Sequence, residues 1–238
     1  MLNGNGEYET IMYKYLDLKG ANLDMKVLVI GANGQVGKHI VNILNESDVH
    51  TVRAMVRKEE QAKELEARGI ETAFASLEGT VHEIKEVMKG CDAVIFSAGS
   101  GGSTGHDKTL LIDLDGAVKA MEAAEGLGIK RFVMVSALQA HHRENWNTSL
   151  IPYYVAKHYA DKILEASGLT YTIVRPGGLL NEPGTGRVDA RENKERGSIP
   201  REDVARVVVE TLSEDHTFGR SFDLVSGDTP IAEAIQSI

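Results

Sequence analysis

The stretch Met25-Lys-Val-Leu-Val-Ile-Gly-Ala-Asn-Gly-Gln-Val-Gly37 decides the fold of this chain. Its apolar run from Lys26 to Ile30 is rich in β-branched side chains, which predicts a buried parallel strand. The run leads into Gly31, Gly34 and Gly37 and then into a helical pattern with apolar side chains on one side. Such a strand, glycine turn and helix N-terminus favour a diphosphate, because the backbone can approach the phosphates and free N–H groups face them. A tight turn that binds nothing is the alternative, and the flanking strand and helix make it the weaker one.

The overall composition is that of an ordinary globular protein. The chain has 238 residues, 42% hydrophobic and 26% charged, which is enough for one α/β domain with a substrate-side elaboration. A net charge of −9 argues against nucleic acid as a partner. The single cysteine, Cys91, excludes an internal disulfide and fits a reducing compartment. No apolar stretch is long enough to cross a membrane, so we expect a cytoplasmic protein without a membrane partner.

Two segments differ in composition from the rest. Residues 1–24 combine Asn-Gly repeats, tyrosines and mixed charge without the apolar segment of a signal peptide, so we interpret them as an N-terminal extension. Residues 25–238 then form the main domain. Within it, residues 178–200 shift to glycine, proline and charge, which predicts a loop-rich connection. Together with residues 137–152, this connection is expected to supply the substrate side.

Strand-like and helix-like patterns alternate along the main domain. Strands are predicted at Lys26–Ile30, Val49–Val56, Ile70–Ala75, Asp92–Ser97, Lys130–Ser136, Tyr171–Val174 and Ser221–Val225. Helical patterns separate them, including a long one from Asp107 to Leu127 and another from Ile151 to Ser167. This order predicts an α/β fold with a doubly wound parallel sheet, helices on both faces and right-handed crossovers. Ligands of such sheets bind at the carboxyl ends of the strands.

The end of the second strand indicates which dinucleotide would bind. An acidic residue about 20 positions after the glycines suits the ribose hydroxyls of NAD, whereas arginine suits the 2′-phosphate of NADP. Arg57 and Lys58 occupy this place, with Arg53 earlier on the same strand. A guanidinium can bind a phosphate bidentately. We therefore predict NADP(H) over NAD(H), the alternative being that Arg57 is only a surface residue.

A candidate catalytic group follows the fifth strand. Tyr153 and Lys157 are four residues apart on a predicted helix, so they share one face, and Ser136 ends the strand. A tyrosine can donate the proton that carbonyl reduction needs, and an adjacent ammonium is expected to lower its pKa toward the working pH. A serine hydroxyl would orient the substrate oxygen. The alternative is that Tyr153 only packs, because Tyr154 is adjacent and makes the register ambiguous.

Taken together, these motifs resemble the short-chain dehydrogenase/reductase superfamily. The similar segments are Gly31-Ala-Asn-Gly34-Gln-Val-Gly37, Ser97-Ala98-Gly99, Val135-Ser136-Ala137, Tyr153-Tyr-Val-Ala-Lys157 and Arg175-Pro-Gly-Gly-Leu179. More narrowly, the chain is similar to small bacterial NAD(P)-binding proteins often labelled sugar epimerases or NAD-dependent epimerase/dehydratases. The resemblance extends over essentially Met25 to Ile238 and implies a Rossmann-like fold.

The resemblance also implies roles for individual residues. The catalytic places fall to Ser136, Tyr153 and Lys157. The cofactor-binding places fall to Gly31, Asn33, Gly34, Gln35, Val36, Gly37, Arg57, Lys58, Ser76, Leu77, Ala98, Gly99, Lys157, Pro176, Gly177, Gly178 and Leu179.

The chain departs from the family pattern at two places. Ala75-Ser76-Leu77 stands where the family often has Gly-Asp-Leu, so the usual carboxylate near the adenine amino group is missing. Asp113 stands where many members have the asparagine of a proton relay. Either Ser136 or the place of Ala137 corresponds to the serine of the extended members.

The main hypothesis is an NADP(H)-dependent oxidoreductase that transfers hydride to or from a small carbonyl, quinone-like or sugar-derived substrate. One alternative is a nucleotide-sugar epimerase or dehydratase, which the short segment after Pro176 disfavours. Another is a non-catalytic NADP(H)-binding redox sensor like relatives among the nitrogen-metabolite-repression regulators, although those generally lack the Tyr/Lys pair. We expect a monomer or homodimer.

Three further residues follow the fifth strand, where a substrate could pass. His141, His142 and Trp146 are the candidates, but paired histidines in a loop are more often solvated than catalytic. Histidine, cysteine and carboxylate side chains show no metal-ligand spacing, so no metal is predicted.

Overall fold

A computed structural model of the chain describes residues 24–102 and 104–238. The predicted N-terminal extension therefore lies outside the described residues, apart from Asp24. Within the described part, no helix is long and apolar enough to span a bilayer.

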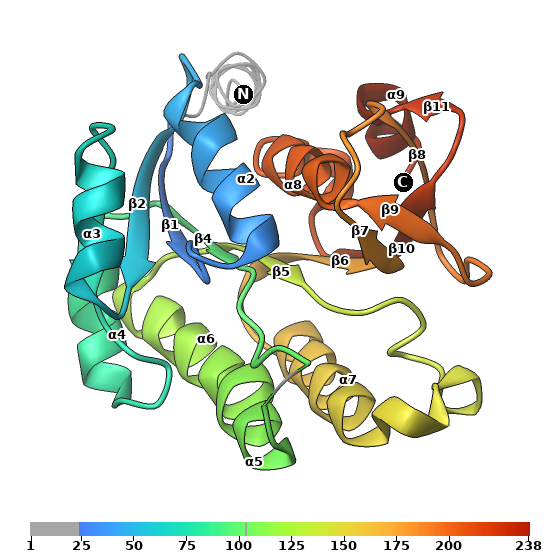
Figure 1. Cartoon of the computed structure of the whole chain (residues 1–238), viewed down its shortest axis with the longest axis horizontal. Coiled ribbons are helices and arrows are strands. Elements are labelled where there is room, and N and C mark those ends of the chain that lie inside the picture. The colour runs from blue at the N-terminus through green and yellow to red at the C-terminus, as the bar shows by residue number, and fades with distance from the viewer. Residues whose placement is uncertain (1–23, 103) are drawn as a thin grey trace, which may run out of the picture.

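The centre of the molecule is a nine-stranded sheet in the order β11-β8-β10-β6-β5-β4-β1-β2-β3 (Figure 1). Strands β1 to β6 and β10 run parallel to their neighbours, and β8 pairs antiparallel with β10 and β11. The order reverses between β1 and β4, as a doubly wound sheet requires, so the predicted fold is confirmed. The strands are β1 Lys26–Ile30, β2 Thr51–Val56, β3 Glu71–Phe74, β4 Ala93–Phe96, β5 Arg131–Val135, β6 Thr170–Pro176, β8 Arg187–Arg191, β10 Arg220–Ser226 and β11 Thr229–Pro230.

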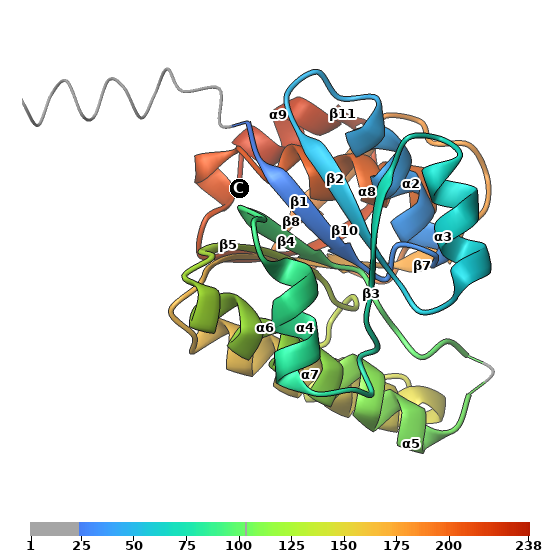
Figure 2. The same ribbon diagram turned by 90° about the vertical axis from the view of Figure 1, so that its left-hand side faces the viewer.

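Helices cover both faces of the sheet and enclose two apolar cores (Figure 2). On one face lie α2 (Gln35–Asn45), α3 (Glu59–Glu66), α8 (Arg201–Glu210) and α9 (Ile231–Gln236). On the other face lie α4 (Val81–Met88), α6 (Asp115–Leu127) and α7 (Ile151–Glu165). The central strands β1 and β4 contribute side chains to both cores, which explains their continuous apolar sequences. Burial on both faces fixes the sheet and hence the positions of the strand ends.

Residues 178–200 contain more regular structure than predicted. They form β7 (Gly178–Leu180) and β9 (Ser198–Pro200), which pair as a small parallel sheet, and also the strand β8. The sequence of β8, Arg-Val-Asp-Ala-Arg, has one fully buried side chain, Val188. It pairs with only one long strand near the sheet edge, so it carries little of the apolar signal that identifies a central strand.

The predicted helix from Asp107 to Leu127 is interrupted. It consists of a short α5 (His106–Lys108), a π-helical turn over Thr109–Leu114, and α6. Turns of the π type are uncommon and frequently occur at functional sites. This one brings Asp113 beside the carboxyl ends of β4 and β5, as described next.

Candidate functional site

The glycine turn after β1 is packed too closely to accept side chains. Gly31 has φ +90°, and a Cβ there would lie 2.6 Å from the backbone nitrogen of Ala98. A Cβ on Gly37 would lie 2.0 Å from the Gly31 carbonyl oxygen. The N-cap of α2, Gly34, offers no side-chain hydrogen bond to the first amides of the helix. These amides are therefore available to an anion, and the turn fits a dinucleotide diphosphate.

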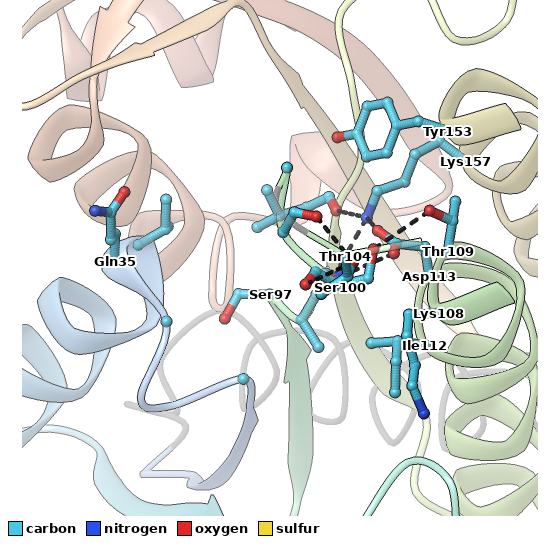
Figure 3. A pocket seen from close by; sticks show the side chains of 18 of the residues that line it. Gln35, Ser97, Ser100, Thr104, Lys108, Thr109, Ile112, Asp113, Tyr153 and Lys157 are labelled. Carbon is cyan, nitrogen blue, oxygen red and sulfur yellow. Dashed lines mark hydrogen bonds and ion pairs between the residues drawn. The ribbon is translucent and has the colours of Figure 1, made fainter. Parts of the chain in front are cut away.

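A cavity of about 970 Å³ extends from the glycine turn to α7 along the carboxyl ends of the strands (Figure 3). Most of the predicted site residues line it. They are Gly31, Asn33, Gly34, Gln35, Val36, Arg57, Leu77, Ala98, Gly99, Ser136, Tyr153, Lys157, Pro176, Gly177 and Leu179. One cavity thus joins the diphosphate turn to the tyrosine–lysine pair.

Four predicted cofactor residues do not line this cavity. Gly37 lies behind the turn, against Gly31, and Gly178 begins β7. Lys58 is an exposed residue at the N-cap of α3. The Ser76 hydroxyl oxygen accepts a hydrogen bond from the backbone amide of Glu78. Gly37 nevertheless shapes the site, because any larger residue there would displace the turn.

Arg53 is also directed away from the cavity. Its guanidinium pairs with Glu71 at 2.7 Å and donates to the carbonyl oxygens of Val87 and Lys89, at the C-terminal end of α4. This arginine lies near the start of β2, whereas ligands bind at the strand's carboxyl end. It therefore stabilises the fold and is not placed to contact a 2′-phosphate.

The end of the cavity near β2 carries two charged side chains, Glu78 and Lys108, that the sequence did not single out. Arg57 and Gln61 line it together with Glu78 and Lys108, which form an ion pair of 2.5 Å. Glu78 directly follows the Ser76-Leu77 segment, so a carboxylate lies next to the segment in which the family pattern often has one. Lys108 adds a second cation from α5 at the same end.

Tyr153, and not Tyr154, faces the cavity. The ring of Tyr154 is buried and stacks on Trp146, with centroids 5.8 Å apart. Tyr153 lines the cavity one helical turn before Lys157, whose ammonium lies 5.7 Å from the centre of the Tyr153 ring. The ambiguity between the two tyrosines is therefore resolved by packing.

Lys157 forms a buried ion pair with Asp113. Its ammonium lies 3.3 Å from one carboxylate oxygen, and the two side chains are only 4% and 1% exposed. The other Asp113 oxygen accepts a hydrogen bond of 2.9 Å from the Ser100 amide. Lys157 also donates to the carbonyl oxygens of Ala98 and Val135. Figure 3 shows the lysine directed toward this polar cluster, with the Tyr153 ring beside it.

The electrostatics of Tyr153 differ from the expectation. Burial raises the pKa of Tyr153, and the Lys157 ammonium opposes this effect as predicted. The Asp113 carboxylate raises it further, and the net direction is upward. For Lys157, burial acts to lower the pKa, but Tyr153 and Asp113 more than offset burial, so the ammonium stays protonated. The lysine thus acts on the pKa of Tyr153 in the predicted direction, but burial and Asp113 outweigh it in the cofactor-free protein.

Ser136 lines the cavity, and its hydroxyl also lies near α7. The hydroxyl oxygen is buried close to the Asp161 carboxylate but makes no hydrogen bond of standard geometry with a described residue. Asp161 pairs with Arg175 at 2.8 Å, and burial raises its pKa. Ser136 is thus within the cavity wall, and its hydroxyl oxygen is enclosed beside the Asp161 carboxylate.

The three candidates in the loop after β5 do not contribute to the cavity as the sequence allowed. His141 and His142 both contact the side-chain oxygen of Asn193, and the Trp146 indole donates to the Ala140 carbonyl oxygen. None of the three lines the cavity. Their placement ties the loop to the β8–β9 connection and gives no support to a substrate role.

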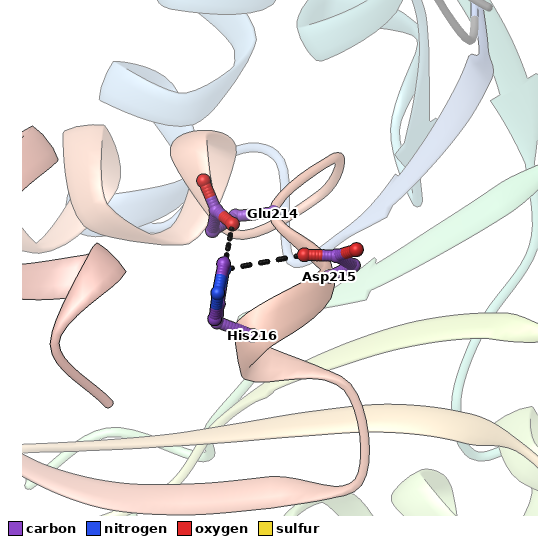
Figure 4. A group of neighbouring side chains, drawn as sticks. All are labelled: Glu214, Asp215 and His216. Atoms are coloured by element: carbon purple, nitrogen blue, oxygen red, sulfur yellow. Dashed lines mark hydrogen bonds and ion pairs between the residues drawn. The ribbon is translucent and has the colours of Figure 1, made fainter. Parts of the chain in front are cut away.

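Within the described residues, one group of side chains has ligand atoms close enough to consider a metal. Glu214, Asp215 and His216 are consecutive, and their ligand atoms lie within 4.8 Å of one another (Figure 4). Two of the three are exposed, and His216 lies 2.6 Å from the Glu214 carboxylate. Exposed acidic groups of this kind are common without a metal, and the cluster does not line the cavity.

Arg201 is a cavity residue that sequence reasoning missed. It begins α8, and its guanidinium donates to the Leu179 carbonyl oxygen and to the Asn181 side chain. No motif precedes it, only the predicted loop-rich segment. The pairing of β7 with β9 brings it to the cavity, and that pairing could not be inferred from composition.

Comparisons with known proteins agree with this geometry. The sequence pattern of the NAD(P)H-binding family matches residues 31–215. A Bacillus subtilis protein named as an uncharacterized sugar epimerase, YhfK, is 65% identical over 214 residues, covering 90% of this chain and 100% of that protein. A solved structure described as an NAD-dependent epimerase/dehydratase from Bacillus halodurans is 44% identical, with a TM-score of 0.85 over 90% of this chain and 100% of its own. The solved oxidoreductase ylbE from Lactococcus lactis is 33% identical, with a TM-score of 0.81 over 90% and 96%.

The first two of these relatives carry names that match the predicted epimerase/dehydratase-like branch, and the third is named as an oxidoreductase. The glycine turn, the switch in strand order and the cavity along the strand ends provide the structural basis for the same assignment. The chain belongs to the NAD(P)H-binding family of Rossmann-fold, oxidoreductase- and epimerase-like proteins.

Proposed function

We propose that the protein is an NADPH-dependent reductase of a small carbonyl, quinone-like or sugar-derived substrate. The observation that carries the proposal is the cavity itself, in which Tyr153 and Lys157 face the same space as the glycine turn. A dinucleotide whose diphosphate lies on this turn has its other end directed along the strand ends toward α7.

The preference for NADP(H) rests on the cations at the β2 end of the cavity. Arg57 is exposed to the cavity, and no described carboxylate forms an ion pair with it. A 2′-phosphate would give this guanidinium a partner, whereas the ribose hydroxyls of NAD would not. Lys108 supplies a further positive charge from α5, although Glu78 already pairs with it.

The chain's own residues provide the proton chemistry. When bound, the dihydronicotinamide supplies a hydride to a carbonyl carbon. Tyr153 donates its phenolic proton to the carbonyl oxygen, and the Lys157 ammonium stabilises the negative charge that this transfer leaves on the phenol. Ser136 offers a hydroxyl for orienting the substrate oxygen. Leu150, Pro152 and Leu179 line the cavity near these groups and help to exclude water from them.

Epimerisation is the second candidate, favoured by the name of the Bacillus subtilis relative. An epimerase returns its cofactor to the starting oxidation state and consumes none. The short segment after Pro176 provides β7, β8 and β9 but no separate substrate domain. A small sugar-derived substrate fits this arrangement better than a large nucleotide sugar.

Oxidation of NADPH, followed by its absorbance with aldehydes, ketones and quinones, tests the proposal. The wild-type protein is expected to oxidise NADPH with at least one of these classes. Tyr153→Phe should lose about 10²-fold or more in rate while it retains NADPH affinity. Tyr154→Phe is the matched control, because that ring is buried against Trp146. Failure of the wild-type protein to consume NADPH with any of these classes would contradict the proposal.

A further inference from the structure

The ion pair between Lys157 and Asp113 is an unusual feature of the cavity. In this chain a carboxylate stands where the family resemblance led us to expect the amide of an asparagine. The π-helical turn brings this carboxylate within 3.3 Å of the ammonium, and both side chains are almost completely enclosed. An enclosed charge interacts with its neighbours far more strongly than one in water.

The position of Asp113 is fixed independently of Lys157. The Ser100 amide donates to one carboxylate oxygen, and a Cβ on Gly99 would lie 3.1 Å from the other. The loop after β4 therefore packs directly against the carboxylate and leaves it little room to turn away. The carboxylate is consequently a fixed part of the cavity wall and is not an adaptable surface group.

We propose that Asp113 is a positioning residue whose carboxylate neutralises Lys157 and keeps the Tyr153 phenol protonated, so that the site donates a proton and works as a reductase. The inference rests on the proposed function and adds the direction of the reaction, which is reduction of the substrate. An epimerase or an alcohol dehydrogenase needs a phenolate in the resting site to accept a proton. A lone ammonium beside Tyr153 would favour that phenolate, and the carboxylate opposes it.

The other groups around Tyr153 do not reverse this balance. From its own helix, Lys157 favours the phenolate, whereas Tyr154 and Asp161 oppose it. The Asp161 charge is already paired with Arg175. From the facing π-helical turn, Asp113 also opposes the phenolate, and burial acts in the same direction. Lys157, the one cation among the described residues that favours the phenolate, is thus held by a carboxylate.

The test is an ultraviolet titration of tyrosinate, which needs no substrate. The spectrum of Tyr153→Phe is subtracted in each background, so that Tyr153 is observed separately from the remaining tyrosines. In Asp113→Asn the ionisation constant of Tyr153 is expected to rise about tenfold or more. An asparagine oxygen can still accept the Ser100 hydrogen bond, so the loop is expected to keep its place. The control is Asp115→Asn, which removes an exposed charge two residues away that pairs with Lys119.

A second variant keeps the test decisive if Asp113→Asn does not fold. Asp113→Ser also removes the carboxylate and keeps a small polar side chain, so the ionisation constant of Tyr153 should rise in this variant as well. An unchanged Tyr153 titration in a folded Asp113→Asn or Asp113→Ser protein would overturn the inference. Because neither titration depends on turnover, failure of the proposed reductase activity would be seen separately, in the NADPH assay.

Discussion

Reversal of the charge at Arg57 is the sharpest test of the cofactor preference. Arg57 lines the β2 end of the cavity, whereas the adjacent Lys58 is exposed and does not line it. Arg57→Asp and Lys58→Asp change the net charge equally and lie one residue apart. A general electrostatic effect would appear in both variants, and a direct phosphate contact would appear only in the first.

The expected magnitude follows from the exposure of the side chain. Two unit charges 4 Å apart interact by about 1 kcal/mol in water and by about 4 kcal/mol at a partly shielded protein surface. Arg57 is exposed, so the lower part of this range applies. A phosphate monoester carries about −1.5 to −2 charges, and reversal replaces an attraction with a repulsion. We expect a loss of about 2–3 kcal/mol, or about 30- to 150-fold in NADPH affinity.

Fluorescence titration with NADPH and with NADH measures both affinities on the same protein. Arg57→Asp should weaken the binding of NADPH but change the affinity for NADH by less than about threefold, because NADH lacks the 2′-phosphate. The NADPH affinity of the wild-type protein should also fall with salt more steeply than that of the variant. If Arg57→Asp lost the same affinity for both nucleotides, or kept its NADPH affinity unchanged, the assignment of Arg57 to the 2′-phosphate would be refuted.

Three further predictions concern the scaffold. Gly37→Ala places a Cβ against the backbone of the glycine turn and should lower the melting temperature and abolish NADPH binding; a variant that binds normally would show that the turn adapts. Arg175→Met leaves Asp161 buried without its cation, so urea unfolding should show a loss of about 3–5 kcal/mol, and a loss below 1 kcal/mol would contradict this. Burial tends to raise the pKa of Glu71, but hydrogen bonds from basic side chains on β1 and β2 hold it below its ordinary value. The stability it contributes is therefore present above the ordinary carboxyl pKa and is lost as the pH falls through the folded value, so Glu71→Gln should flatten this acid limb of the stability curve.

The central fold could be predicted because its signals are local and strong. The strand before Gly31 is buried on both faces, and its sequence after Lys26 is an uninterrupted apolar run. The predicted β1 therefore has the same bounds as the observed one. The apolar side chains of α4 recur at helical spacing, so this helix can also be recognised from its sequence. Parallel order then follows from the alternation of strands and helices.

The edge of the sheet and part of the cavity could not be predicted in this way. Strand β8 alternates charged and small side chains, and only its pairing with β10 defines it. Arg201 and Lys108 reach the cavity through the β7–β9 pairing and the short α5, which are long-range or irregular features. The departure at Asp113 was visible in the sequence, but its ion pair with Lys157 depends on the π-helical turn.

A crystal structure of the protein with bound NADPH tests the central claim most directly. The account predicts the diphosphate against the backbone of Gly34 to Val36, the 2′-phosphate on Arg57, and the nicotinamide beside Pro176 with its reactive face toward Tyr153. A nicotinamide ring outside the cavity, or one separated from Tyr153 by other side chains, would contradict it.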